Sequence, residues 1–312
     1  MTTGSLIVIG ILQALLIALV APLYSGFARV LRAKMHSRHG PPVFQNYYDL
    51  FKLMKRQEIV PAQGSLVFRI TPYLTIVAIL LAVMIIPILV AQSPFGGVGD
   101  MILVIYLLAL VRFFTSLSGL SSGSTFGGMA ARRELLISAL IEPLMLLVLF
   151  VMALMAGSTN LGVITTGIIT GRLPYYATVW LGMISFAFVV FIEAGKLPFD
   201  LSEAEQELQE GPLTEYSGHG LALMKWGLYM KQLAVAALFL AVFAPFGSMV
   251  AASPAGGLLA LIAFLLKAAV LYALAALVEN GMARLRFIKA PSVTWIALGV
   301  GLLCFAFYLV RI

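Results

Sequence analysis

Acidic side chains are concentrated in one short stretch of this chain, between two hydrophobic segments. The stretch covers residues 193–218 and holds seven of the 13 Asp and Glu residues, which are Glu193, Asp200, Glu203, Glu205, Glu207, Glu210 and Glu215. On a helix, Glu203, Glu207 and Glu210 would share one face, where carboxylates repel one another unless a cation or shared protons intervene. A buried face of this kind would take up and release protons near neutral pH, whereas an exposed face would be a solvated helix surface. The spacing leaves both alternatives open.

The elements that hold this stretch are expected to be membrane spans. Hydrophobic residues make up 62% of the 312 residues and charged residues only 11%. Apolar runs of the length that a bilayer requires recur along the chain, at about 4–25, 70–91, 101–119, 135–156, 177–195, 229–250, 256–278 and 293–311. The sequence therefore predicts an all-α polytopic membrane protein with about eight transmembrane helices, forming a single integral membrane domain over residues 1–312.

The basic residues predict how the spans are oriented. Fifteen of the 20 Lys and Arg residues fall in the connections that follow the odd-numbered spans, and the opposite side has only Arg172 and Arg311. Short loops rich in Lys and Arg face the cytoplasm. We therefore expect both termini to be periplasmic and the two large loops, 26–69 and 196–228, to be cytoplasmic.

Each large loop is expected to contain a short helix. In the first, Phe44, Tyr48 and Phe51 recur at helical spacing and predict an amphipathic helix on the membrane surface. Two alternatives are open for this helix. It is a lipid anchor alone, or it is a lipid anchor that also forms one wall of an entrance to an internal cavity. In the second loop, Asp200 can cap a helix that ends at Gly211-Pro212, which predicts about three turns over 201–210.

Several ionisable residues fall within or at the ends of the predicted spans. They are Arg112, Glu134, Glu142, Glu193, Lys267 and Glu279. A charge at bilayer depth is costly to insert, so such residues usually face the bundle interior and pair. They indicate a polar route or an internal salt-bridge network, or, for those near span ends, side chains that reach the interface. The sequence does not say which acid pairs with which base.

Metal and nucleic-acid binding are not expected. The chain has one cysteine, Cys304, inside the last apolar run, and three scattered histidines. These cannot form a cysteine or histidine metal cluster, so any redox centre belongs to a partner. The net charge of +7 follows membrane topology and gives no indication of nucleic acid.

The acidic stretch resembles the signature of a family of membrane subunits found in respiratory complex I and its hydrogenase relatives. The matching residues are Glu193, Pro198-Phe-Asp-Leu201, Glu203, Glu205, Glu207-Leu208, Gly211 and Thr214-Glu-Tyr-Ser-Gly218. Arg38-His-Gly-Pro41 is similar to a family turn after the first span, and Arg133 and Glu142 match a family pair at the fourth span. The resemblance covers essentially the whole chain.

Departures from the quinone-reducing branch favour the hydrogenase branch. Lys196 stands where that branch usually has arginine, and Gln209-Glu-Gly-Pro212 replaces a Val-Ala-Gly-Tyr type of sequence. The segments 118–128 and 279–286 are similar to the membrane subunit of formate hydrogenlyase-type NiFe hydrogenases, known as subunit 4 or component C.

The resemblance implies a bacterial inner-membrane complex in which this non-catalytic chain joins a soluble redox arm to a membrane arm. The implied partners are a NiFe hydrogenase large subunit, iron–sulfur subunits, antiporter-like membrane subunits, a candidate formate dehydrogenase and membrane lipid. The NiFe centre and the iron–sulfur clusters would lie in those partners, and the quinone cavity of the other branch would be vestigial or filled with lipid.

Two groups of residues become functional candidates by this resemblance. Candidates for the proton path or for charge coupling are Glu142, Glu193, Asp200, Glu203, Glu205, Glu207, Glu215, Lys267 and Glu279. Candidates for docking the soluble arm are Arg38, Arg132, Arg133, Lys196, Arg284 and Arg286. Two other functions stay open: a quinone-site subunit of a complex I-like NADH-quinone oxidoreductase, and a stand-alone ion or solute transporter.

Overall fold

A computed structural model describes residues 3–173, 176–201, 205–250 and 254–310. Regular structure in these ranges is helical, apart from isolated bridges at Val90–Met249 and Asp100–Asn160. The α-helices in chain order are α1 (Thr3–Met35), α2 (Gln45–Met54), α3 (Leu66–Ile85), α4 (Met101–Ser121), α5 (Thr125–Ala156), α6 (Leu161–Ile169), α7 (Ala177–Glu193), α8 (Glu205–Leu208), α9 (Gly218–Phe243), α10 (Pro254–Gly281) and α11 (Ala290–Val310). Short 3₁₀ turns lie at Gly96–Val98 (η1), Gly211–Leu213 (η2) and Phe287–Lys289 (η3).

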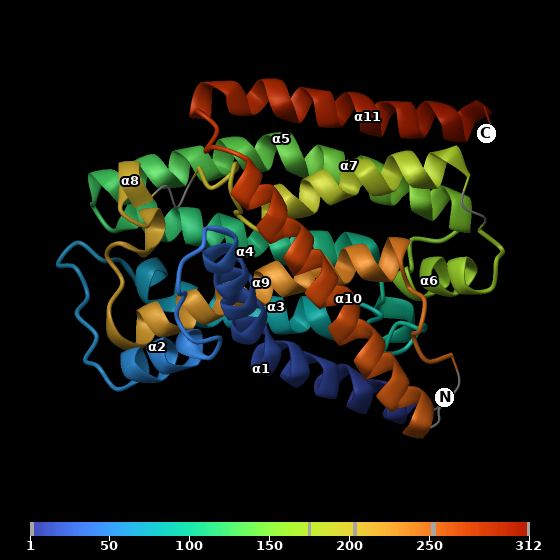
Figure 1. Ribbon diagram of the computed structural model, residues 1–312, viewed down its shortest axis with the longest axis horizontal. Coiled ribbons are helices and arrows are strands. Elements are labelled where there is room, and N and C mark those ends of the chain that lie inside the picture. Colours follow the sequence, from blue (N-terminus) through green and yellow to red (C-terminus); the bar gives the residue numbers. More distant parts are fainter. Residues whose placement is uncertain (1–2, 174–175, 202–204, 251–253, 311–312) are drawn as a thin grey trace.

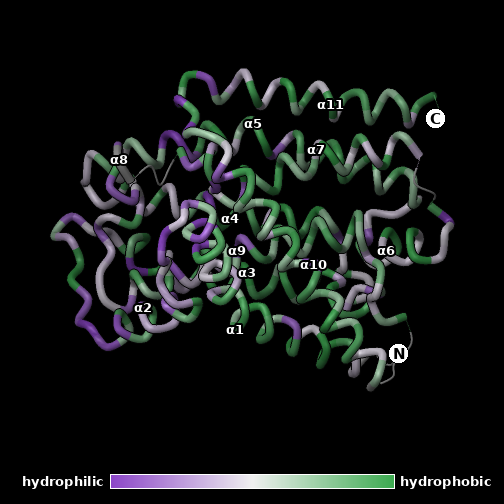
Figure 2. Tube along the Cα trace, in the orientation of Figure 1, coloured by the Kyte–Doolittle hydropathy of each residue, from purple (hydrophilic) through white to green (hydrophobic). Residues whose placement is uncertain are grey.

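The long helices lie side by side, with α9 in the middle of the bundle and α10 crossing over it (Figure 1). The chain ends marked N and C lie at one end of this bundle, and α2 and α8 lie at the other, which we call the loop end (Figure 1). Hydrophilic residues gather at the loop end, whereas the long helices are largely hydrophobic (Figure 2). The bundle therefore has the polarity of a protein that spans a bilayer with one large polar face.

The expected membrane architecture is confirmed. Seven helices of the described chain are long and apolar enough to cross a membrane, and α7, at 17 residues, is slightly shorter. With α7 they correspond to the eight predicted spans. Helices α1 and α5, of 33 and 32 residues, exceed the ~20 residues that a 30 Å hydrocarbon core requires, so their ends extend beyond it.

Two helices end earlier than the sequence predicted. Helix α3 stops at Ile85 and α9 at Phe243, each just before a proline (Pro87 and Pro245) that cannot continue a helix. A neighbouring side chain donates hydrogen bonds to carbonyls at or just beyond each helix end. Gln13 of α1 donates to the Val83 and Ile86 carbonyls at 2.8 and 2.9 Å, and Lys267 of α10 donates to those of Ala244 and Phe246 at 2.8 Å each.

Prolines inside two helices also receive side-chain support. A proline has no N–H, so the carbonyl four residues earlier loses its helical partner. For Pro72 in α3 that carbonyl belongs to Phe68, and it accepts a 2.8 Å hydrogen bond from the Tyr216 hydroxyl. For Pro22 in α1 it belongs to Ala18, and it accepts a 2.8 Å bond from the indole N–H of Trp226. The first bond ties α3 to the acidic loop, and the second ties α1 to α9.

One of the two predicted loop helices is confirmed and the other is wrong in length. Helix α2 forms as expected. Tyr48 and Phe51 on its outer face and Phe44 just before it are exposed, while Leu50 is buried. The predicted three-turn helix over 201–210 is wrong in length, because the described residues form only α8. Glu210 has φ +69°, a left-handed conformation that interrupts a helix.

Close approach of α4 and α5 sets the position of the charged residues discussed next. Gly119 and Gly127 lie opposite each other, and a Cβ on either glycine would come within 2.9 Å of the other's carbonyl oxygen. Small residues allow helix backbones to approach closely in membranes. This contact brings the acids at the start of α5 alongside α4.

Candidate functional site

Arg112 of α4 is the centre of a group of buried charges. Its Nη2 lies 2.6 Å from Glu193 Oε1 of α7, its Nε lies 3.4 Å from Glu134 Oε1 of α5, and its Nη1 donates to the Ser138 hydroxyl at 2.9 Å. The residue is only 4% exposed. A guanidinium at this depth requires such partners, because a buried unpaired charge is strongly unfavourable.

A second base reaches the same acid from the central helix. Lys231 of α9 places Nζ 3.4 Å from Glu193 Oε2, and both residues are buried, at 6% and 4% exposure. Four helices, α4, α5, α7 and α9, thus contribute to one connected group. We call Arg112, Glu134, Glu193 and Lys231, together with Glu142, which lines a cavity with Arg112, the ionic chain.

Glu142 forms the outer end of the ionic chain. It is half-buried in α5, one turn beyond Ser138, and together with Arg112 and Tyr106 it lines an open cavity of about 500 Å³ on the α4–α5 face. In the described part of the chain, no ion pair joins Glu142 to a base. The ionic chain carries two bases and three acids, so this carboxylate has no cation of its own.

A polar cavity lies at the inner end of the ionic chain. This loop-end cavity has a volume of about 320 Å³ and lies among α1, α9, α10 and the segment after α7. A smaller cavity of about 50 Å³, lined by Arg112, Glu193 and Lys231, shares Gly195 and Gln232 with it. The polar path therefore leads from the loop end, past the ionic chain, to the outer face of α4 and α5.

Ion pairs surround the loop-end cavity. Glu279 of α10 contacts Arg32 at 3.1 Å and Lys196 at 3.9 Å. Asp200 pairs with Arg284 at 2.7 Å, and Glu210 pairs with Lys225 at 3.3 Å. Each of these acids has a basic partner within the chain.

The acidic loop does not gather its carboxylates on one face. Glu207 is exposed and pairs with Arg133 at 2.7 Å, away from the Glu210–Lys225 pair, so these two acids do not form the shared face expected from helical spacing. Glu215 is half-buried. Glu203 lies outside the described residues, and for Glu205 the structure gives the backbone of α8 alone.

The docking candidates fall into two groups. Arg38, Arg132 and Arg286 are exposed at or near the loop end. Lys196, Arg133 and Arg284 instead contact acids of this chain, and the Arg133 guanidinium also lies 5.3 Å from the centre of the Phe287 ring. The exposed group alone is available for a partner without breaking an internal ion pair.

Lys267 is separate from the other candidates. Its amine binds the carbonyls that follow α9, at the end of the bundle opposite the loop end. A cation at a helix C-terminus is favoured by the helix dipole and by the unpaired carbonyls there. This geometry is that of a helix cap.

Two members of these networks were not expected from the sequence. Lys231 lies inside a predicted span. A lysine within a span indicates an interior residue, and the same argument made Lys267 a candidate. Arg32 lies beyond residue 25, where the first span is predicted to end, but α1 continues to Met35 and includes it. No group of three or more His, Cys, Asp or Glu residues that could hold a metal occurs in the described residues.

Comparison with known proteins gives consistent similarities. Residues 7–309 match the family model described as NADH dehydrogenase. The chain is 47% identical to hydrogenase-4 component C of Escherichia coli (strain K12), across 98% of this chain and 97% of the relative. It is 46% identical to formate hydrogenlyase subunit 4 of the same organism, across 95% and 96%.

More distant relatives share the architecture. A subunit of the NADH-quinone oxidoreductase of Anaplasma marginale (strain St. Maries) is 30% identical, across 69% of this chain and 66% of the relative. A chain of the solved membrane-bound sulfane sulfur reductase, an archaeal respiratory membrane complex, superposes with a TM-score of 0.79 at 23% identity, covering 95% of this chain and 99% of that one. At that identity the likeness shows the fold.

Proposed function

Because this chain belongs to the NADH dehydrogenase family, in the branch of hydrogenase-4 component C and formate hydrogenlyase subunit 4, we propose that it is the membrane-anchor and coupling subunit of a hydrogen-evolving NiFe hydrogenase complex. In that complex it joins a soluble NiFe and iron–sulfur arm to antiporter-like membrane subunits, and a formate dehydrogenase completes the assembly. The NiFe centre and the iron–sulfur clusters belong to the partners.

The soluble arm binds at the loop end, and the membrane partners bind at the α4–α5 face. Exposed Arg38, Arg132 and Arg286 support the first assignment, since they can pair with acids of a partner. Glu142 supports the second, because a half-buried carboxylate at bilayer depth needs a polar neighbour instead of lipid. The complex lies in a bacterial inner membrane with the loop end cytoplasmic and both termini periplasmic, as the positive-inside rule favours.

The ionic chain relays protons between these two surfaces. A change of charge in the docked arm alters the electrostatic field at Glu279 and Asp200, and through Lys231 and Arg112 it biases the protonation of Glu193 and Glu142. Glu142 receives or releases the proton toward the membrane partner. The single observation that carries this proposal is the unbroken contact series from Lys231 through Glu193 to Arg112, with Glu142 at its outer end.

The quinone-site function is the second candidate, and two observations favour it. Subunits of NADH-quinone oxidoreductases are among the 30% identical relatives, and the loop-end cavity is large enough to hold part of a ligand. The closer hydrogenase relatives and the ion pairs that line the cavity favour the first candidate.

The first test is the composition and activity of the isolated complex. The tagged chain is extracted in mild detergent, and the eluate is assayed for nickel, iron and viologen-linked hydrogen evolution. Nickel, iron and hydrogen evolution together support the proposal, whereas an iron-rich, nickel-free eluate that reduces quinone selects the second candidate. A folded chain with no metal and no partner points to a transporter.

The second test separates anchoring from proton relay. The complex with Glu142→Gln is reconstituted in liposomes beside a matched Glu58→Gln control, since Glu58 is a half-buried glutamate that pairs with His219 and is not a candidate for the proton path. We expect hydrogen evolution to persist in both, with proton movement coupled to it lost only in Glu142→Gln. Unchanged proton movement in Glu142→Gln would remove the relay from the proposal and leave the anchoring role standing.

A further inference from the structure

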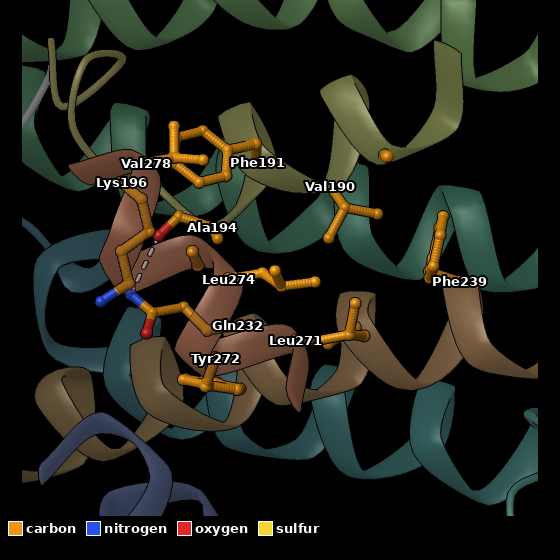
Figure 3. Close-up of a pocket in the computed structure, with 13 residues that line it drawn as sticks. Val190, Phe191, Ala194, Lys196, Gln232, Phe239, Leu271, Tyr272, Leu274 and Val278 are labelled. Carbon is orange, nitrogen blue, oxygen red and sulfur yellow. Dashed lines mark hydrogen bonds between the residues drawn. The ribbon is translucent and has the colours of Figure 1, made fainter. Parts of the chain in front are cut away.

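A narrow apolar pocket lies between α7, α9 and α10, outside the ionic chain. It has a volume of about 190 Å³, and its walls are almost entirely aliphatic or aromatic, with Val190, Phe191, Phe239, Leu271 and Leu274 among them (Figure 3). Leu274 is 53% exposed on the outer surface of α10, so the pocket borders the lipid-facing surface. Its occupant can therefore enter from the bilayer.

The pocket runs along the helices and becomes polar at one end. On α7 its lining goes from Ala187 to Ala194, a rise of about 10 Å toward the loop end. Lys196 and Gln232 stand at that polar end, and Phe239 lies at the apolar end (Figure 3). A phospholipid in the loop-side leaflet has the same orientation, with its headgroup toward the loops and its acyl chains toward the bilayer centre.

The polar end opens into the loop-end cavity, since Lys196 and Gln232 line both. The loop-end cavity contains five basic and three acidic side chains, an excess of two positive charges. Its acids Asp200, Glu210 and Glu279 have Arg284, Lys225 and Arg32 as their closest partners. Lys196, whose amine is 3.9 Å from Glu279, is thus an additional cation placed where the polar and apolar cavities meet.

Two buried polar atoms at the pocket also indicate a ligand. Gln232 donates its amide N–H to the Ala194 carbonyl at 2.9 Å, which leaves its Oε1 buried without a hydrogen-bond donor in the described residues. The Tyr272 hydroxyl is likewise buried without a partner there, in a residue only 5% exposed. Buried polar atoms are nearly always hydrogen-bonded, so a bound molecule with both donors and acceptors fits this site.

We propose that the joined cavities hold one anionic glycerophospholipid. Its phosphate lies beside Lys196, a hydroxyl of its headgroup donates to Gln232 Oε1, and one acyl chain fills the apolar pocket. The positive excess favours an anionic head over a neutral quinone ring, and the apolar walls favour an alkyl chain. This lipid joins α7 to α10 beside Glu279, and its presence does not depend on the hydrogenase assignment.

Two variants address the two halves of the ligand. Lys196→Gln removes the charge-assisted contact with the phosphate and is expected to weaken retention about tenfold, which corresponds to about 1.4 kcal/mol. Ala275→Phe places a ring in the apolar pocket and is expected to exclude the acyl chain. Ala255→Phe is the matched control, because Ala255 is an exposed residue of α10 that does not line the pocket.

The measurement is native mass spectrometry and lipid extraction of the full chain in its complex, purified in mild detergent. One phosphatidylglycerol or cardiolipin per chain is expected in the wild type and in Ala255→Phe, with strong depletion in Lys196→Gln and Ala275→Phe. Retention of a quinone, or equal lipid content in all four proteins, would overturn the proposal.

A second measurement guards against misfolded variants. The wild-type, Ala255→Phe and Lys196→Gln complexes are each delipidated in detergent. Each is then heated with added phosphatidylglycerol or with added phosphatidylcholine. Phosphatidylglycerol alone should raise the unfolding temperature of the wild type and of Ala255→Phe, and it should fail to do so in Lys196→Gln. Equal stabilisation by both lipids would mean that the site does not select an anionic head and would refute the assignment.

Discussion

Arg112 and Glu193 form a 2.6 Å ion pair between α4 and α7 in the bundle interior, with side-chain exposures of 4% and 2%. Neither residue is near the other in sequence, and each also contacts a further charge, Glu134 or Lys231. The pair is therefore the junction through which charges on four helices are connected. Its burial makes it both a structural requirement and the narrowest point of the proposed relay.

Removing one member of this pair should destabilise the bundle strongly. Arg112→Gln leaves Glu193 with Lys231 as its remaining cation, and breaking a buried pair costs about 3–5 kcal/mol. The unfolding temperature of the complex in detergent should fall clearly for Arg112→Gln. It should stay near the wild-type value for Arg172→Gln, since Arg172 is exposed and belongs neither to the ionic chain nor to the docking candidates. Equal unfolding temperatures for the two variants would show that the interior is hydrated enough to solvate Glu193.

Hydrophobic periodicity and the loop motif predicted the fold class, the long helices and the family, all of which are confirmed. Helix ends were the weaker part of the prediction. Pro87 and Pro245 lie inside apolar runs, and hydropathy alone carries those runs past the prolines. The structure ends α3 and α9 before them because a proline cannot continue a helix, and Gln13 and Lys267 bind carbonyls at these ends.

The ionic chain could be predicted only in part. The cost of burying charge identified Arg112, Glu142 and Glu193 as interior residues. Their pairing depends on how α4, α5, α7 and α9 rotate against one another, which periodicity does not specify. The acidic loop was predicted as one helix because its spacing is helical, but the left-handed turn at Glu210 directs its acids to separate bases.

Two loop acids with the same partner distance should differ in their contribution to stability. Asp200 and Glu207 each lie 2.7 Å from an arginine, but their side chains are 15% and 54% exposed. An exposed ion pair contributes only about 0–1 kcal/mol, whereas a more buried one is screened less. Asp200→Asn should therefore lower the unfolding temperature more than Glu207→Gln, and the gap should persist in high salt. A larger effect of Glu207→Gln would indicate that α8 is held more tightly than its exposure implies.

Tyr216 should make stability depend on alkaline pH. Its ring stacks on Phe68 with centroids 4.0 Å apart, and burial raises the pKa of the phenol to about 12, from an ordinary value of 10.0. The folded-state pKa lies above the unfolded one, so the stabilisation by the neutral phenol is complete below about pH 10 and is lost as pH rises toward 12.

The comparison that checks this is chemical unfolding of wild type and Tyr216→Phe at about pH 8 and pH 11. Tyr216→Phe should be less stable at the lower pH by about 1 kcal/mol, because the Phe68 carbonyl loses its donor opposite Pro72. Its stability should then change less between the two pH values than that of the wild type. Parallel pH profiles would mean that the phenol remains protonated or hydrated in both states.

The Lys267→Met variant tests whether Lys267 is a helix cap or a proton carrier. Its amine satisfies the carbonyls of Ala244 and Phe246, so Lys267→Met should destabilise the bundle by about 1–3 kcal/mol through these unpaired acceptors. Proton movement per hydrogen evolved should stay at the wild-type value in the molecules that remain assembled. Lys289→Met, at an exposed lysine, is the matched control for loss of one positive charge. A normal unfolding temperature combined with lost proton movement would instead place Lys267 on the proton path, as its position within an apolar span first suggested.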